Sequence, residues 1–192
     1  MRNGKFIAPT TLAFVCAGGL AFAQNNPRAA NPDTNKMEQQ GQKVTDADRD
    51  ALRMIHQTNQ VEMEMGSIAK SNAGSKDVKD YARMLEQDHQ KADKQVIAIA
   101  KKEQIELTLP KTGGEQKTES QQLDELRHLK GPAFDQKFLQ TMVDDHTKAI
   151  DEVQKQMNDV NIPQLKSMMQ GMLPELKHHR DMAQALLQKQ TG

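Results

Sequence analysis

Two short segments of the sequence place an aspartate, a histidine and a lysine in the same order. Asp88-His89-x-Lys91-Ala92 recurs further along the chain as Asp145-His146-x-Lys148-Ala149. In both segments the histidine falls on the apolar stripe of a predicted helix. Burying an imidazole costs free energy unless its nitrogens find partners, so inward histidines predict either a polar layer or a site that holds a ligand.

A third histidine has the same kind of position in another predicted helix. His179 follows Leu165, Met169, Met172 and Leu176 at spacings of three and four residues, which is the period of a helix face turned towards a core. Three predicted helices therefore each point one histidine inward. Convergent imidazoles are ligands that suit zinc, copper, nickel or iron.

The first predicted helix supplies a carboxylate. Glu64 lies about 60° and Glu62 about 100° from its core line, which is drawn through Met54, Thr58, Val61, Met65 and Ile68. If the helices run up, down, up and down, the tight turns at Gly74 and Asn161 share one end. The three histidines then fall within about one turn of a common level, with Glu64 about 7 Å nearer the turns. The predicted metal ligands are Glu64, His89, His146 and His179.

Capping and breaking residues divide the domain into helices. Thr45 and Ser75 are typical N-caps, and the segment 105–120, which contains Pro110 and a Gly-Gly pair, is predicted as a long loop. The predicted elements are long helices at 45–72, 75–104, 132–158 and from 163 nearly to the C-terminus, with a short helix at 121–130. This pattern predicts an all-α fold, an antiparallel four-helix bundle with a long crossover loop between helices two and three.

The N-terminal residues are typical of an export signal. Arg2 and Lys5 precede an apolar run from Phe6 to Ala23 that ends in the small-x-small pattern of a cleavage site. The segment that follows has almost no large apolar side chains and is predicted to be flexible. We therefore expect a signal peptide at 1–23, a disordered linker at 24–44 and the helical domain at 45–192. Cleavage would leave no transmembrane helix.

Composition argues against several classes of function. The chain has 26 basic and 26 acidic residues, Trp 0 and Tyr 1, so neither a basic patch nor aromatic stacking platforms indicate nucleic-acid binding. Cys16, the only cysteine, lies inside the predicted signal peptide, which excludes a disulfide in the mature protein. No nucleophile elbow, phosphate-binding loop or serine triad is present, and no catalytic residue is predicted.

An ordered series of motifs over about residues 50–190 resembles an exported bacterial family. The motifs are Glu64-Met65-Gly66-Ser67-Ile68-Ala69, Met84-Leu85-x-x-Asp88-His89-x-Lys91-Ala92, Leu109-Pro110, Gly131-Pro132-Ala133-Phe134-Asp135, Met142-Val143-x-Asp145-His146-x-Lys148-Ala149 and Leu173-Pro174-x-Leu176-x-x-His179. The family is domain of unknown function 4142, often labelled a predicted outer membrane protein and regarded as ferritin-like. The resemblance implies an exported four-helix bundle and brings no settled activity. The matching polar positions are Glu64, Asp88, His89, Asp145, His146 and His179; His178 departs from the family pattern.

Three interpretations of the histidines stay open. In the first, an exported protein of the periplasm or outer membrane binds zinc, copper, iron or nickel in stress or metal homeostasis. In the alternative, a non-catalytic structural or partner-binding envelope module, with an envelope partner or as a homodimer, uses buried histidines only to set helix register. In the third, the segments Glu86-x-x-His89 and Glu175-x-x-His178 belong to a di-iron oxidase or ferroxidase, although the third long helix lacks the inward glutamate of such sites.

Overall fold

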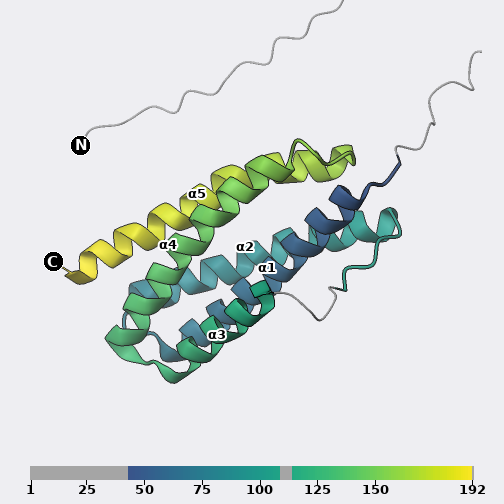
Figure 1. The fold of residues 1–192 in the computed structure, drawn as a ribbon. Coiled ribbons are helices and arrows are strands. Elements are labelled where there is room, and N and C mark those ends of the chain that lie inside the picture. Colours follow the sequence, from purple (N-terminus) through teal and green to yellow (C-terminus); the bar gives the residue numbers. More distant parts are fainter. Residues whose placement is uncertain (1–42, 109–113, 192) are drawn as a thin grey trace, which may run out of the picture. The chain divides into compact units, whose positions relative to one another are not determined.

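The computed structural model describes residues 43–108 and 114–191, which form five α-helices (Figure 1). The helices are α1 (Asp46–Asn72), α2 (Lys76–Lys102), α3 (Gly114–His128), α4 (Gly131–Gln156) and α5 (Pro163–Thr191). These residues contain no β-strand, and an isolated bridge joins Ala73 to Gly131. The all-α prediction is confirmed. The predicted signal peptide and almost all of the predicted linker lie outside the described residues.

Side-chain caps begin the first two helices where the sequence predicts them. The Thr45 hydroxyl accepts the backbone N–H of Asp48, and the Asp48 carboxylate accepts the N–H of Thr45. At the start of α2, the Ser75 hydroxyl accepts the N–H of Val78. These bonds satisfy N–H groups that have no partner inside the helix. Local sequence therefore sets the starting points of both helices.

Two buried aspartates tie the helical hairpins α1–α2 and α4–α5 to each other. Asp48 of α1 accepts hydrogen bonds of 2.7 and 2.9 Å from the backbone N–H groups of the turn 161–162. Asp135 of α4 accepts two bonds of 2.8 Å from the N–H groups of the turn 74–75. Each hairpin thus supplies the acceptor for the tight turn of the other, and the turn N–H groups are satisfied without water.

The two tight turns lie at opposite ends of the helices. Asp48, at the start of α1, contacts the α4–α5 turn, whereas the α1–α2 turn follows the end of α1. Figure 1 shows α4 running in the same direction as α2. The expectation that both turns share one end is wrong. Helix α3, which follows α2 in the chain, runs back towards the end of the bundle at which α4 begins (Figure 1).

Helix α3 replaces part of the predicted loop. The segment 105–120 was expected to lack regular structure, but α3 begins at Gly114, and 109–113 lie outside the described residues. The residues after Gly114 are mostly Glu, Gln and Lys, which favour a helix. Leu123 and Leu126 are buried in an apolar cluster that also contains residues of α1. Their burial gives this polar segment a reason to stay helical against the bundle.

A polar layer separates two apolar clusters inside the bundle. One cluster surrounds Leu52, Val96 and Leu165, and the other surrounds Met65, Leu85 and Phe138. On each long helix the buried residues between the two clusters are polar: Asn59 and Glu62 on α1, His89 and Asp93 on α2, His146 on α4, and His179 on α5. None of the described helices has an apolar stretch long enough to cross a bilayer.

Candidate metal centre

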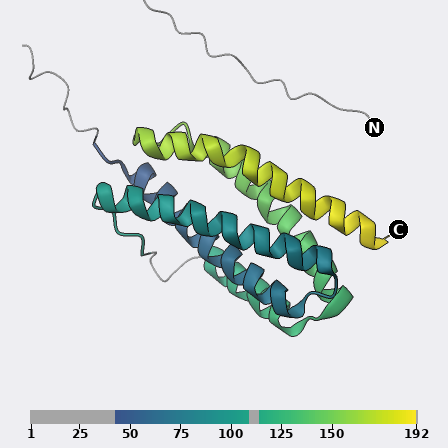
Figure 2. The same ribbon diagram turned by 180° about the vertical axis from the view of Figure 1, so that it is seen from behind.

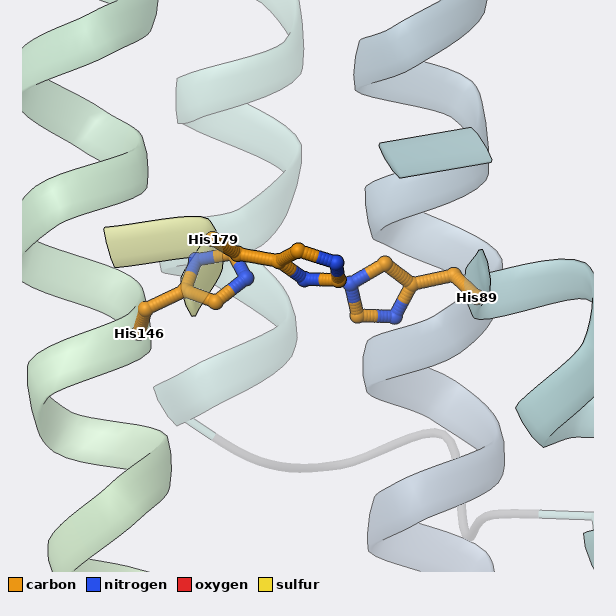
Figure 3. A group of neighbouring side chains, drawn as sticks. All are labelled: His89, His146 and His179. Atoms are coloured by element: carbon orange, nitrogen blue, oxygen red, sulfur yellow. The ribbon is translucent and has the colours of Figure 1, made fainter. Parts of the chain in front are cut away.

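Three imidazoles from three helices meet in this polar layer. His89 of α2, His146 of α4 and His179 of α5 are each at most 5% exposed, and their ring centroids lie 5.3 to 5.8 Å apart. Figure 3 shows the rings extending from separate helices towards one another. One nitrogen of each ring lies within 4.8 Å of those of the other two. The predicted common level of the three histidines is confirmed.

One nitrogen of each ring is bonded to an oxygen outside the trio. The three acceptors are a side-chain amide, a backbone carbonyl and a carboxylate. Because all three oxygens only accept hydrogen bonds, the bonded ring nitrogen must carry the proton. The pairs are His89 Nδ1 with Asn59 Oδ1 at 2.9 Å, His146 Nδ1 with the Met142 carbonyl at 2.9 Å, and His179 Nε2 with Asp88 Oδ2 at 3.3 Å.

The other nitrogen of each ring is buried and has no protein partner. These atoms are His89 Nε2, His146 Nε2 and His179 Nδ1. Since the proton sits on the bonded nitrogen, each of these atoms presents a lone pair. Buried acceptors without a donor are costly, and three of them close together favour a bound cation. Metal-bound histidines also characteristically donate their second ring nitrogen to a carboxylate or carbonyl, as here.

Burial keeps the imidazoles in their neutral form. It lowers the pKa of His146 to about 4, and the nearby His179 adds to the effect. Burial also lowers the pKa of His89 well below its usual value. The pKa of His179 is lowered by burial as well, although its hydrogen bond to Asp88 opposes the shift. Neutral imidazole is the form that binds metal ions, so protons do not compete for these nitrogens at neutral pH.

The spacing of the rings suits a transition metal after a small closure. Zn–N bonds of about 2.0–2.1 Å at tetrahedral angles place ligand nitrogens about 3.4 Å apart. The ligand nitrogens here are separated by up to 4.8 Å, so the rings need to approach one another by up to about 1.4 Å. Three imidazoles would leave a fourth coordination position for water or another small ligand.

The sequence can now be placed among known proteins. Residues 33–186 match the family described as "Domain of unknown function (DUF4142)". The chain belongs to the DUF4142 family. A solved structure of similar fold is titled "Crystal structure of DUF305 fragment from Deinococcus radiodurans", with 11% sequence identity, a TM-score of 0.69, and coverage of 76% of this chain and 98% of that chain. At this identity the likeness shows the fold alone. A comparison with curated proteins finds no match.

The two aspartates of the repeated Asp-His-x-Lys-Ala motif have different surroundings. Asp88 accepts the hydrogen bond of His179 and is about one-quarter exposed. Asp145 accepts from the Gln122 amide of α3, and burial raises its pKa despite that bond. His178, which precedes His179, is exposed and does not join the three buried histidines.

Glu64 is not brought to the histidines. It is an exposed residue of α1 whose carboxylate pairs with Arg127 of α3. The buried carboxylate of this helix is Glu62, which is 4% exposed and has its Oε1 3.9 Å from His146 Nδ1. The prediction that Glu64, rather than Glu62, points inward is wrong.

The buried face of α1 is rotated by about 100° from the predicted core line, although both include Met65. The buried face includes Leu52, Ile55, Asn59, Glu62 and Ala69, and apolar periodicity alone does not count an asparagine and a glutamate as core residues. Asn59 and Glu62 are therefore two buried residues that the predicted core line does not contain. The spacing of three and four residues from Leu52 to Glu62 is the signal that could have found them.

Glu62 adds an ionisable group without adding a negative charge at neutral pH. Burial raises its pKa to about 8, and Asp145 contributes to the increase. Its Oε2 atom has no hydrogen-bond partner. Nearby, the Tyr81 hydroxyl donates to the carbonyl of His179 at 3.2 Å, and burial, followed by Glu62, raises the pKa of Tyr81. A cation bound by the histidines would favour the ionised form of Glu62.

The two Glu-x-x-His segments do not form a di-iron ligand set. Glu86 pairs with Lys70, with an oxygen–nitrogen distance of 2.7 Å, instead of pointing towards His89. In the second segment, both Glu175 and His178 are exposed. Di-iron carboxylate bundles need glutamates projecting inward from several helices. The positions of these residues give a two-iron centre no support.

Proposed function

We propose that this DUF4142 protein binds a divalent transition metal through His89, His146 and His179. The observation that carries the proposal is the pattern of ring nitrogens. In each ring one nitrogen is buried without a hydrogen-bond partner, and the other nitrogen donates to an oxygen of the protein. Glu64, which was expected among the ligands, is omitted because it pairs with Arg127 on the surface.

The ligand set narrows the class of metal. Neutral imidazoles without a thiolate suit zinc, copper, nickel and iron better than magnesium or calcium, which prefer oxygen ligands. Asp88 places a carboxylate behind His179, where it strengthens the ring as a ligand. The function that follows is binding or buffering of such an ion, in metal homeostasis or stress.

We further propose that the helices form a ferritin-like, antiparallel four-helix bundle with α3 inside its crossover. Among the long helices, α1 contacts α2 and α4, and α5 contacts α2 and α4. Helices in contact therefore run in opposite directions, while the diagonal pair α2 and α4 runs in the same direction (Figure 1). A crossover of 103–130 supports this reading, because one long connection is typical of ferritin-like bundles.

The proposed location is the periplasm or the outer membrane. Support comes from the sequence at 1–23, where two basic residues precede an apolar run with a small-x-small end. Protein expressed from the full sequence and recovered from the cell envelope should begin at Gln24 when its N-terminus is sequenced. Recovery of the intact N-terminus in the cytoplasm would contradict export.

A competing proposal gives the same residues a purely structural role. Each ring is already anchored by a protein oxygen, so the layer could fix helix register, as buried polar residues do in coiled coils. Metal content distinguishes the two roles, because a register layer needs no ion. The protein would then be a non-catalytic envelope module that acts through a partner or a homodimer.

Adjacent histidines on α5 provide a matched test. Purified protein is incubated separately with excess Zn²⁺, Cu²⁺, Ni²⁺ or Fe²⁺, desalted, and measured by elemental mass spectrometry. Wild type and His178→Ala should retain one of these ions stoichiometrically, whereas His179→Ala should bind it more than about 100-fold more weakly. Removing only the hydrogen-bond partner of a ligand histidine already lowers metal affinity about 10–100-fold. Absence of stoichiometric metal from the wild type with all four ions would exclude the metal-binding function.

A further inference from the structure

A small cavity reaches the histidines between α2 and α5. It has a volume of about 20 Å³ and its lining includes Asp88, His89, Ala92, Glu175 and His179. Glu175 is exposed and Ala92 is half-buried, while the two histidines are buried. The lining therefore passes from the protein surface to two of the three rings. The volume is sufficient for one water molecule.

The opposite side of the histidine layer is covered. Helix α3 packs against α1 and α4, and its Gln122 amide donates to Asp145, the residue before His146. His146 is 1% exposed and does not line the cavity. Figure 2 shows α2 and α5 facing the viewer with no other described helix over them. Access to the rings is therefore more direct between α2 and α5 than beside α3.

We propose that the metal ion enters and leaves through this cavity, with Glu175 and Asp88 as the first groups it meets. This inference rests on the metal centre proposed above. A fully hydrated ion is larger than the cavity, so it must exchange water for protein oxygens before it reaches the rings. Two carboxylates at the mouth supply such oxygens and attract a cation. Ala92, the last residue of the first repeated motif, keeps the passage open because its side chain is small.

The repeated motif provides a matched pair of variants for a steric test. Ala92→Leu fills the cavity, while Ala149→Leu makes the same change at the equivalent position of α4, which does not line the cavity. The probe is Co²⁺, whose visible absorption reports binding in stopped-flow mixing and release to excess EDTA. Ala92→Leu should slow both loading and extraction by about tenfold or more, because packed interiors leave no space for an ion to pass. Final occupancy should be unchanged, and Ala149→Leu should behave as wild type.

A charge reversal at the mouth tests the same route without filling it. Glu175→Lys should slow Co²⁺ loading at low salt by about tenfold, and the difference from wild type should shrink as salt screens the charge. Glu152→Lys, at an exposed position of α4, is the control. Glu175→Lys and Glu152→Lys together test the proposed route even if Ala92→Leu does not fold.

The outcomes separate the route from the metal centre itself. Wild-type protein that takes up Co²⁺ while Ala92→Leu and Glu175→Lys load at the wild-type rate would overturn the route and leave the centre intact. Slowing by Ala149→Leu or Glu152→Lys to the same extent would also overturn it, because the effect would then not be local. Wild-type protein that binds neither Co²⁺ nor the four ions above would overturn the proposed function.

Discussion

The hairpins α1–α2 and α4–α5 carry the same Asp-His-x-Lys-Ala pattern in different surroundings. Both copies turn their histidine into the polar layer, at His89 and His146. The preceding aspartates differ, since Asp88 holds His179 at the edge of a cavity and Asp145 is covered by Gln122 of α3. Helix periodicity thus decides where each histidine points, whereas the packing of a further helix decides what the neighbouring aspartate does.

The strongest way to break this comparison is to cut the hydrogen bonds that join the hairpins. Asp48→Ala and Asp135→Ala each leave two turn N–H groups without their acceptor. We expect each change to lower the free energy of unfolding by about 4 kcal/mol, since hydrogen bonds to charged groups contribute about 1.5–3 kcal/mol each. Urea unfolding followed by circular dichroism measures the loss.

Exposed aspartates on the same helices are the controls for this experiment. Asp50→Ala on α1 and Asp151→Ala on α4 should change stability by less than about 0.5 kcal/mol. Asp48 should also show a pH effect: burial opposes it, but the bonds from Ile162, Thr45 and Asn161 lower its pKa. Stability from this residue is therefore present above its unfolded pKa and lost as pH falls through the folded one. Equal losses of stability in the control variants and in Asp48→Ala and Asp135→Ala would refute the role assigned to Asp48 and Asp135.

A second test uses the carboxylate that the first hairpin places beside His146. The pKa of Glu62 is raised by burial from 4.5 to about 8, so the folded state holds a proton that the unfolded state releases. Its contribution to stability is present below pH 4.5 and lost as pH rises to about 8, a change of about 4 kcal/mol by pH 8 for the metal-free protein. Glu62→Gln should remove this slope, measured as unfolding free energy at several pH values.

Glu64→Gln is the matched control, because Glu64 lies two residues away and is exposed. It should keep the wild-type loss of stability between about pH 6.5 and 8. The histidines act with the opposite sign at lower pH: burial lowers the pKa of His146 to about 4, so stability falls as pH drops from about 6.5, the unfolded value, towards 4. A wild-type slope that survives in Glu62→Gln would contradict the neutral, buried state of this residue.

The three histidines could be predicted from sequence for a reason that topology does not affect. His89 is the central residue of α2, and His146 and His179 lie close to the midpoints of α4 and α5. Reversing the direction of a hairpin moves its ends but leaves its middle in place. The common level was therefore correct although the tight turns were placed at the wrong ends.

Apolar periodicity taken alone does not identify Glu62 and Asn59. Asn59 is the central residue of α1, but a polar residue carries no apolar signal. The predicted apolar stripe passes instead through Met54 and Val61, which are only partly buried. The direction of α4 and the helical start of α3 depend on contacts between distant segments, such as the one between Asp48 and the turn 161–162. Local patterns do not contain that information.

A third test asks whether the two aspartates of the repeated motif differ in function as they do in surroundings. Asp88→Asn removes the negative charge behind His179, and we expect metal affinity to fall about 10- to 100-fold, the usual cost of losing a partner of a ligand histidine. Asp145→Asn should change affinity less, because Asp145 bonds Gln122 and no histidine. Competition with a chromophoric chelator measures both, and equal losses would erase the distinction.

The smallest effects concern how closely each hairpin packs. A Cβ on Gly66 would lie 3.0 Å from the Ala82 carbonyl oxygen and 3.2 Å from Glu86 Cβ, whereas a Cβ on Gly171 would meet nothing within 4 Å. Gly66→Ala must push α1 away from α2 and should cost about 1 kcal/mol. Gly171→Ala should instead stabilise α5 by about 1 kcal/mol, because alanine loses less backbone entropy in a helix. Thermal unfolding of the two variants side by side measures the opposite signs, and a stabilised Gly66→Ala would show that the first hairpin is no more tightly packed than the second.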